Sequence, residues 1–181
     1  MFLFGKRVVF LGAHPDDLKD VKDEHYKSMA VLGVPKENIL LGPFTTRVFP
    51  DSRQEILEYF LKLRGDFNPD LIFTHSRQDV HQDHNTMTDE ALRAFRGITV
   101  LGFDVVRSSH GFFPHFLAEV TEEDVNAKIE ALSRYETYRD KYYFNGELTR
   151  SIMVRHGALA ECPFAEGFDI LRIVGQFEFR K

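Results

Sequence analysis

The chain has 181 residues, of which 43% are hydrophobic and 28% charged, as in an ordinary globular protein, and we expect one domain over residues 1–181. Its formal net charge of −5 argues against a nucleic-acid partner, since nucleic-acid-binding proteins usually carry a basic face. Cys162 is the only cysteine, which excludes an internal disulfide and a cysteine-rich zinc site.

Short apolar runs alternate with helix-like segments from the start of the chain. Residues 8–11 predict a buried strand, residues 20–32 a helix, and residues 38–41 a second strand. Ser52 and Glu55 have the spacing of a capping box, and the apolar residues after them recur at helical spacing. These segments predict two strand–helix units in succession.

The alternation continues beyond this point. Residues 71–74 predict a third buried strand, residues 84–95 a helix, residues 98–103 a fourth strand, and a later helix opens at Thr121. This order predicts an α/β fold with a mostly parallel sheet and helices on both faces. Ligands of such sheets gather beyond the carboxyl ends of the strands.

A first polar cluster, Ala13-His14-Pro15-Asp16-Asp17, directly follows the first predicted strand. Two adjacent carboxylates repel each other, and a bound cation relieves that repulsion, so one aspartate can bind a metal while its neighbour faces a substrate. Taken alone, an Asp pair after a strand is more often a solvated turn or a helix cap.

A second cluster, residues 75–84, follows the third predicted strand. His81 and His84 are three residues apart, a spacing that places both side chains on one side of a starting helix. Imidazole and carboxylate ligands suit zinc, and also iron or manganese. A His-x-x-His pair alone is ambiguous, but two such clusters at successive strand ends predict a functional site.

Together the segments Ala13–Asp17, Thr74–Ser76 and His81–His84 resemble the PIG-L/LmbE-like de-N-acetylase family, the N-acetylglucosaminyl deacetylases. Residues 32–34, 49–51, 69–70 and 165–168 extend the resemblance over most of the chain. The resemblance implies a Rossmann-like three-layer fold. It also implies removal of an acetyl group from an amino sugar or sugar conjugate by a metal-activated water.

The resemblance further implies a role for individual residues. The metal, Zn²⁺ first and Fe²⁺ or Mn²⁺ as alternatives, would be held by His14, Asp17 and His84. Asp16 would be the general base. His81 would stabilise the oxyanion or protonate the leaving amine, with Asp83 orienting it. General chemistry agrees, because a divalent metal lowers the pKa of a bound water and polarises a carbonyl. Substrate-binding residues are not identified.

The chain departs from the family pattern in two places. Leu18 stands where the family usually has Glu, and one early strand–helix unit is absent before the helix that ends near Leu32. A natural deletion, an engineered truncation and an incomplete sequence would each explain that absence. Val21 stands three residues before Glu24, where the family often has a substrate-facing Arg. The predicted metal set is complete, whereas the substrate pocket is altered.

Three functions therefore remain open. The first is hydrolysis of a small N-acetylated sugar or conjugate; the second is hydrolysis of another amide or ester. The third is a catalytically inactive metal- or ligand-binding homologue, although bare metal binding would need neither Asp16 nor His81. No apolar run nears the roughly 20 residues of a membrane span and no signal peptide is apparent, so we expect a cytoplasmic protein. The oligomeric state is open, a homo-oligomer included.

Overall fold

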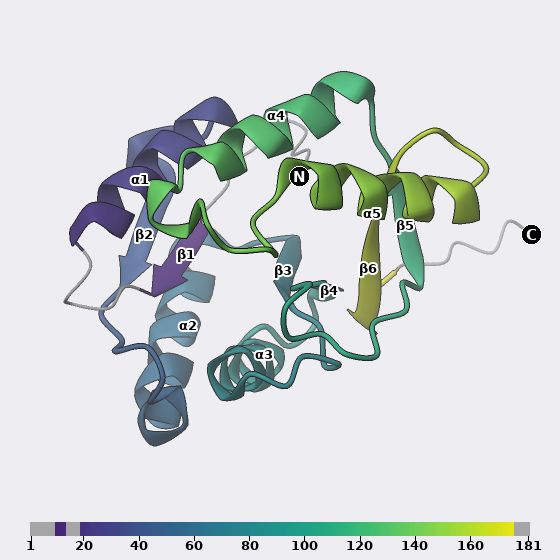
Figure 1. Cartoon of the computed structure of the whole chain (residues 1–181). Helices are drawn as coiled ribbons and strands as arrows, with labels where there is room; N and C mark the ends of the chain where they lie inside the picture. Colours follow the sequence, from purple (N-terminus) through teal and green to yellow (C-terminus); the bar gives the residue numbers. More distant parts are fainter. Residues whose placement is uncertain (1–9, 14–18, 176–181) are drawn as a thin grey trace, which may run out of the picture. The chain divides into compact units, whose positions relative to one another are not determined.

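The computed structural model describes residues 10–13 and 19–175 (Figure 1). Its α-helices are α1 Lys19–Val31, α2 Arg53–Phe67, α3 Gln82–Ala94, α4 Glu122–Ser133 and α5 Gly146–Leu159. The strands are β1 Phe10–Ala13, β2 Ile39–Gly42, β3 Leu71–His75, β4 Thr99–Phe103, β5 Phe116–Glu119 and β6 Ala165–Arg172. Short 3₁₀ helices are η1 Lys36–Asn38, η2 Phe49–Ser52 and η3 Glu136–Tyr138.

The chain divides into two compact units, each built from two stretches. The first unit comprises residues 1–46 and 118–166, and the second comprises residues 47–117 and 167–181. The expectation of a single domain over residues 1–181 stays a prediction. No helix within the described ranges is both long and apolar enough to cross a membrane.

Among its described residues, the first unit contains a two-stranded parallel sheet and the α-helices α1, α4 and α5. β1 pairs with β2 from Phe10↔Ile39 to Ala13↔Gly42, and α1 connects the two strands. α1 ends where Gly33 takes a φ of 71°, a left-handed conformation that glycine adopts without steric cost. α1 packs on α4, and α4 packs on α5. The predicted start of α4 is confirmed, since Thr121 and Asp124 form a capping box.

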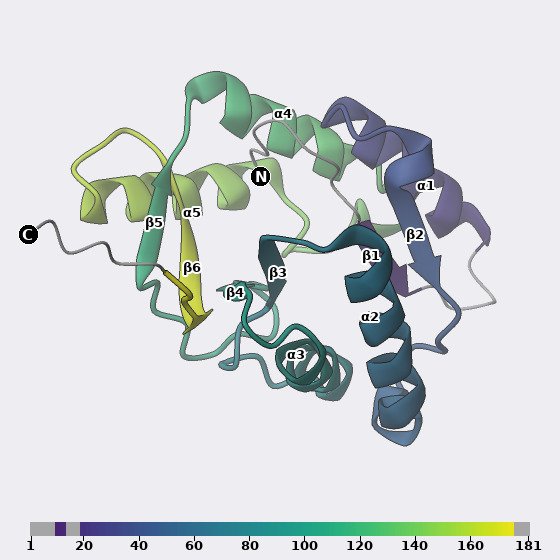
Figure 2. The ribbon, with the colours of Figure 1, turned by 180° about the vertical axis from the view of Figure 1, so that it is seen from behind.

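The larger sheet has the strand order β3-β4-β6-β5, and its strands β3 and β4 belong wholly to the second unit. β3 and β4 are parallel, whereas β6 runs antiparallel to β4. α3 packs against both α2 and β3 (Figure 2). The apolar residues buried between these elements include Ile56, Phe60, Ala91, Ala94, Phe95 and Val100. This packing fixes the N-terminal end of α3 near the carboxyl end of β3.

The α/β class is confirmed, and so are the predicted strands and helices from β1 to β4 and the later helix α4. The single, mostly parallel sheet needs correction, because the described strands form two sheets and the larger one is mixed. The larger sheet is mixed because β6 runs antiparallel to β4. Ser52 makes no capping hydrogen bond, because it already closes the 3₁₀ turn η2. The Rossmann-like three-layer arrangement stays a prediction.

Candidate functional site

The candidate site lies where β3 ends and the chain turns into α3. His81 is the N-cap residue of α3, and its Nδ1 accepts a hydrogen bond from the backbone N–H of Asp83 at 3.2 Å. A ring nitrogen that accepts from an N–H carries no proton itself. In the neutral His81 ring, the proton therefore resides on Nε2, which makes this nitrogen a donor.

Asp79 orients the second histidine of the pair. Its Oδ2 lies 2.7 Å from Nδ1 of His84 and also accepts from the Ser108 hydroxyl at 3.0 Å, while Oδ1 accepts from the His81 backbone N–H at 2.8 Å. Burial raises the pKa of Asp79, but these hydrogen bonds outweigh burial, and the net shift of its pKa is downward. The carboxylate is therefore ionised and holds the proton of His84 on Nδ1.

This geometry leaves Nε2 of His84 as the lone-pair nitrogen. Metal-binding histidines almost always have their other ring nitrogen held in this way by a carboxylate or carbonyl, which fixes the tautomer and the ring orientation. His84 thus fits a divalent metal as a nitrogen donor. Asp79 is a positioning residue that sequence reasoning missed; its one sequence signal is a carboxylate five residues before His84.

Three imidazole rings stack at the site. The His75 and His84 rings lie 3.9 Å apart at an interplanar angle of 5°, and the His81 and His84 rings lie 4.4 Å apart at 23°. Burial, and then the positive charge that His84 can carry, lower the pKa of His75 to about 3. Its Nδ1 is buried without a hydrogen-bond partner in the described part of the chain. His75 is therefore a neutral ring that supports His84 from one face.

The carboxylate of Asp83, which was expected to orient His81, contacts the segment before α2 instead. Its buried carboxylate accepts hydrogen bonds from the backbone N–H groups of Arg47 and Phe49, the latter at 3.2 Å. Asp83 thereby fastens the segment before α2 to the start of α3. Its link to His81 runs through its backbone N–H alone.

Two further contacts hold the loop that carries Asp79. The Ser76 hydroxyl donates to the carboxylate of Asp169 on β6, and the backbone N–H of Val80 donates to the Ser108 carbonyl at 2.9 Å. A Cβ on Gly102 would lie 3.0 Å from Cα of Ser76, so glycine allows β4 to approach the loop closely. Ser108, in the loop after β4, therefore contributes directly to the site.

The predicted site residues divide into two groups. His81, Asp83 and His84 come together at the N-terminal end of α3. His14, Asp16 and Asp17 lie outside the described residues. Within residues 10–13 and 19–175, no group of three histidine, cysteine or carboxylate side chains is arranged to hold a metal. The ligand set of His14, Asp17 and His84 therefore stays a prediction.

Comparison with known proteins gives structural matches only. No family model and no curated protein matches the chain. The N,N'-diacetylchitobiose deacetylase from Pyrococcus horikoshii is 18% identical with a TM-score of 0.68, over 91% of this chain and 73% of that protein. The A40926 pseudoaglycone deacetylase is 19% identical with a TM-score of 0.66, over 81% and 67% of the two chains. A zinc-inhibited teicoplanin deacetylase is 16% identical with a TM-score of 0.64, over 81% and 71%. The chain therefore shares the fold of these deacetylases.

Proposed function

We propose that this chain is a metal-dependent hydrolase that removes an N-acetyl group from an amino sugar or sugar conjugate. The observation that carries the proposal is the Asp79–His84 pair, 2.7 Å apart at the carboxyl end of β3. The fold also supports the proposal, because solved structures with a similar fold include deacetylases. One of them is a diacetylchitobiose deacetylase, and another is described in a zinc-inhibited form.

In this proposal, Nε2 of His84 is one metal ligand and the predicted ligands His14 and Asp17 complete the set. Zn²⁺ is the first candidate, with Fe²⁺ and Mn²⁺ as alternatives, because imidazole and carboxylate donors suit all three. A divalent cation at this position supplies Lewis acidity, which polarises the amide carbonyl and lowers the pKa of water.

The remaining chemistry falls to the side chains. Asp16 accepts a proton from the attacking water as its oxygen bonds to the acetyl carbon. His81 donates a hydrogen bond through Nε2 to the carbonyl oxygen as negative charge develops there, and the proton held by Asp16 passes to the departing nitrogen. The C–N bond breaks and leaves acetate and the free amine. Asp83 contributes by fixing the His81 ring through its backbone N–H.

Acetate release from a panel of N-acetylated sugars, on protein of measured metal content, tests the proposal. We expect about one divalent ion per chain, sugar-dependent acetate release, and loss of both in His84→Ala. The matched control is His110→Ala, an exposed histidine in the loop after β4, which should keep both.

Two results would replace the proposal with the alternatives. Turnover of simple amides or esters without turnover of any sugar would indicate a hydrolase of another substrate class. Metal binding that depends on His84, with no turnover of any substrate, would indicate an inactive binding homologue. Full metal occupancy in His84→Ala would remove His84 from the ligand set.

A further inference from the structure

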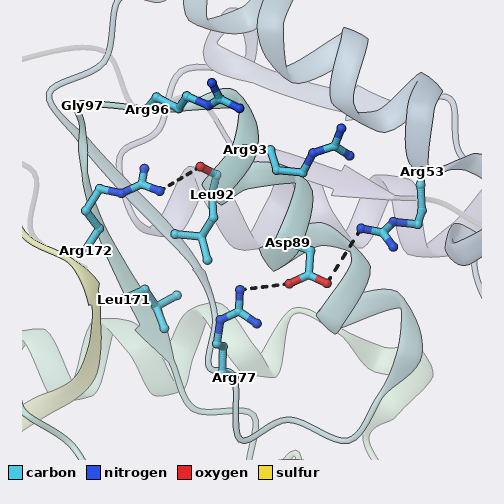
Figure 3. Close-up of a pocket in the computed structure, with 9 residues that line it drawn as sticks. All are labelled: Arg53, Arg77, Asp89, Leu92, Arg93, Arg96, Gly97, Leu171 and Arg172. Atoms are coloured by element: carbon cyan, nitrogen blue, oxygen red, sulfur yellow. Dashed lines mark hydrogen bonds and ion pairs between the residues drawn. The ribbon is translucent and has the colours of Figure 1, made fainter.

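A pocket of about 660 Å³ lies against the second half of α3, within the second unit. Figure 3 shows arginine side chains converging on it from α2, the loop after β3, the end of α3 and β6. These residues are Arg53, Arg77, Arg93, Arg96 and Arg172. The pocket is distinct from the candidate catalytic site, whose histidines His81 and His84 lie at the other end of α3.

A buried carboxylate holds two of the arginines. Glu90 is fully buried, and its two oxygens accept from Nε of Arg53 at 2.7 Å and from a terminal nitrogen of Arg93 at 2.5 Å. The side chains of Arg53 and Arg93 nevertheless remain 50% and 48% exposed. Each guanidinium has five N–H donors, so both keep donors that face the solvent.

The positive charges of the other three arginines are less fully neutralised by carboxylates. Asp89 pairs with Arg77 at 3.0 Å and lies 4.0 Å from Arg53. Arg172 donates to the carbonyls of Leu92 and Phe95 at 2.9 and 3.0 Å, and has no carboxylate partner in the described part of the chain. Arg96 makes no hydrogen bond or ion pair with any described residue. Five guanidinium groups thus share two carboxylates, and the pocket keeps a surplus of positive charge.

We infer that this pocket binds a small ligand with two linked phosphate groups. Guanidinium groups stay charged at all relevant pH values and bind phosphate oxygens through paired N–H donors. Most of the arginines are already ordered by their hydrogen bonds, which lowers the entropic cost of binding. The volume lies within the usual range for small-molecule sites and exceeds the need of a single phosphate. Leu92 and Leu171 offer an apolar wall for the rest of the ligand.

A small ligand fits these observations better than a nucleic acid does. Five of the 23 lysines and arginines line this pocket, and the whole chain carries a net charge of −5. A nucleic-acid-binding surface usually spreads its basic residues along a face or stripe. The inference does not depend on the proposed deacetylase activity.

Calorimetric titration with inorganic pyrophosphate at physiological ionic strength tests the inference. We expect saturable binding by the parent, and binding weakened by about tenfold or more in Arg96→Gln, since a charged hydrogen-bond donor is lost. Arg96 is exposed and unpaired, so this substitution should leave the fold intact. Arg77→Gln provides a second variant with the same expected loss.

Two controls sharpen the test. Arg134→Gln removes the same charge from an exposed ion pair on α4 and should change the affinity by less than about twofold, because salt screens distant charges. His84→Ala should bind pyrophosphate as the parent does, which separates this pocket from the candidate metal site.

The inference is overturned if the parent shows no saturable binding, or if Arg96→Gln and Arg77→Gln both bind like the parent. Equal weakening in Arg134→Gln would also overturn it, since the effect would then be one of net charge. Loss of binding in His84→Ala would place the pyrophosphate at the metal site instead. Tighter, Arg96-dependent binding of an oligonucleotide would indicate a nucleic-acid surface and contradict a small ligand.

Discussion

Asp79 and His84 form a carboxylate–imidazole pair, with 2.7 Å between Oδ2 and Nδ1, and the two residues stand on either side of the start of α3. The pair determines which nitrogen of His84 is available to a ligand. The buried carboxylate is itself held by the His81 backbone and by Ser108, so the imidazole is oriented before any metal binds.

The first prediction follows from this pair. Asp79→Asn keeps the shape of the side chain but removes the charge that fixes the His84 tautomer, so metal affinity should fall by about 10- to 100-fold. Competition titration against a chelating dye measures the affinity. The control variant Asp89→Asn removes a carboxylate from the second half of α3. Its metal affinity should equal that of the parent. An unchanged affinity in Asp79→Asn would show that the pair does not position a ligand.

The second prediction concerns the buried carboxylate under the arginine-lined pocket. Glu90→Gln leaves Arg53 and Arg93 without their shared ionised acceptor and should lower the free energy of unfolding by about 1–3 kcal/mol. Urea denaturation measures this loss. The control Glu130→Gln breaks the exposed pair with Arg134 on α4 and should cost less than about 0.5 kcal/mol. Equal losses in the two variants would mean that burial of Glu90 adds nothing.

The helices of this protein could be predicted from the sequence better than its sheet. Apolar spacing and cap residues are local, and they indicated each helix from α1 to α4. β6 combines small and charged residues with apolar ones, and its antiparallel place beside β4 is set by tertiary pairing. The helix α5, which begins at Gly146, and the short edge strand β5 were not predicted either.

The candidate site was also predictable only in part. Its histidines were indicated by spacing, because His81 and His84 are neighbours in the chain. The roles of Asp79 and Ser108 depend on how two loops meet, which no local pattern encodes. The family resemblance implied that Asp83 orients His81, yet its carboxylate contacts the backbone of Arg47 and Phe49. The predicted absence of an early strand–helix unit stays a prediction, since residues 14–18 lie outside the described residues.

The third prediction concerns stability in acid. His156 on α5 is buried, and burial, followed by the charges of Arg155 and Lys128, lowers its pKa, while Glu166 acts in the opposite direction. The unfolded chain takes up this proton near the ordinary value of 6.5, whereas the folded chain does so only at lower pH. Between these two pKa values the unfolded state holds more protons than the folded state. The stability that depends on neutral His156 is therefore fully present above the ordinary pKa and is lost as the pH falls.

Urea denaturation at about pH 7.5 and about pH 5.5 measures this effect. The parent should lose stability between the two values, and His156→Gln, which cannot titrate, should lose less over the same interval. The comparison uses the difference between the two pH values, so a uniform cost of the substitution cancels. An identical pH-dependent loss in both proteins would assign the acid sensitivity to other groups.

The last prediction separates Asp16 from Asp17, which are adjacent in the sequence and are proposed to have different tasks. Two carboxylates this close repel each other, and a cation bound by one of them leaves the other to exchange protons. Asp17→Ala should therefore lose metal and activity together. Asp16→Asn should keep its metal while single-turnover rates fall by about 10²-fold or more, as expected for a lost general base. The apparent substrate affinity should change less than the rate, because the interaction is made in the transition state.

Metal analysis and single-turnover kinetics on both variants and the parent provide the test. Near-parental turnover in Asp16→Asn would remove Asp16 as the base. An inactive parent that still binds metal through Asp17 would instead favour the binding homologue, in which the altered pocket no longer supports catalysis.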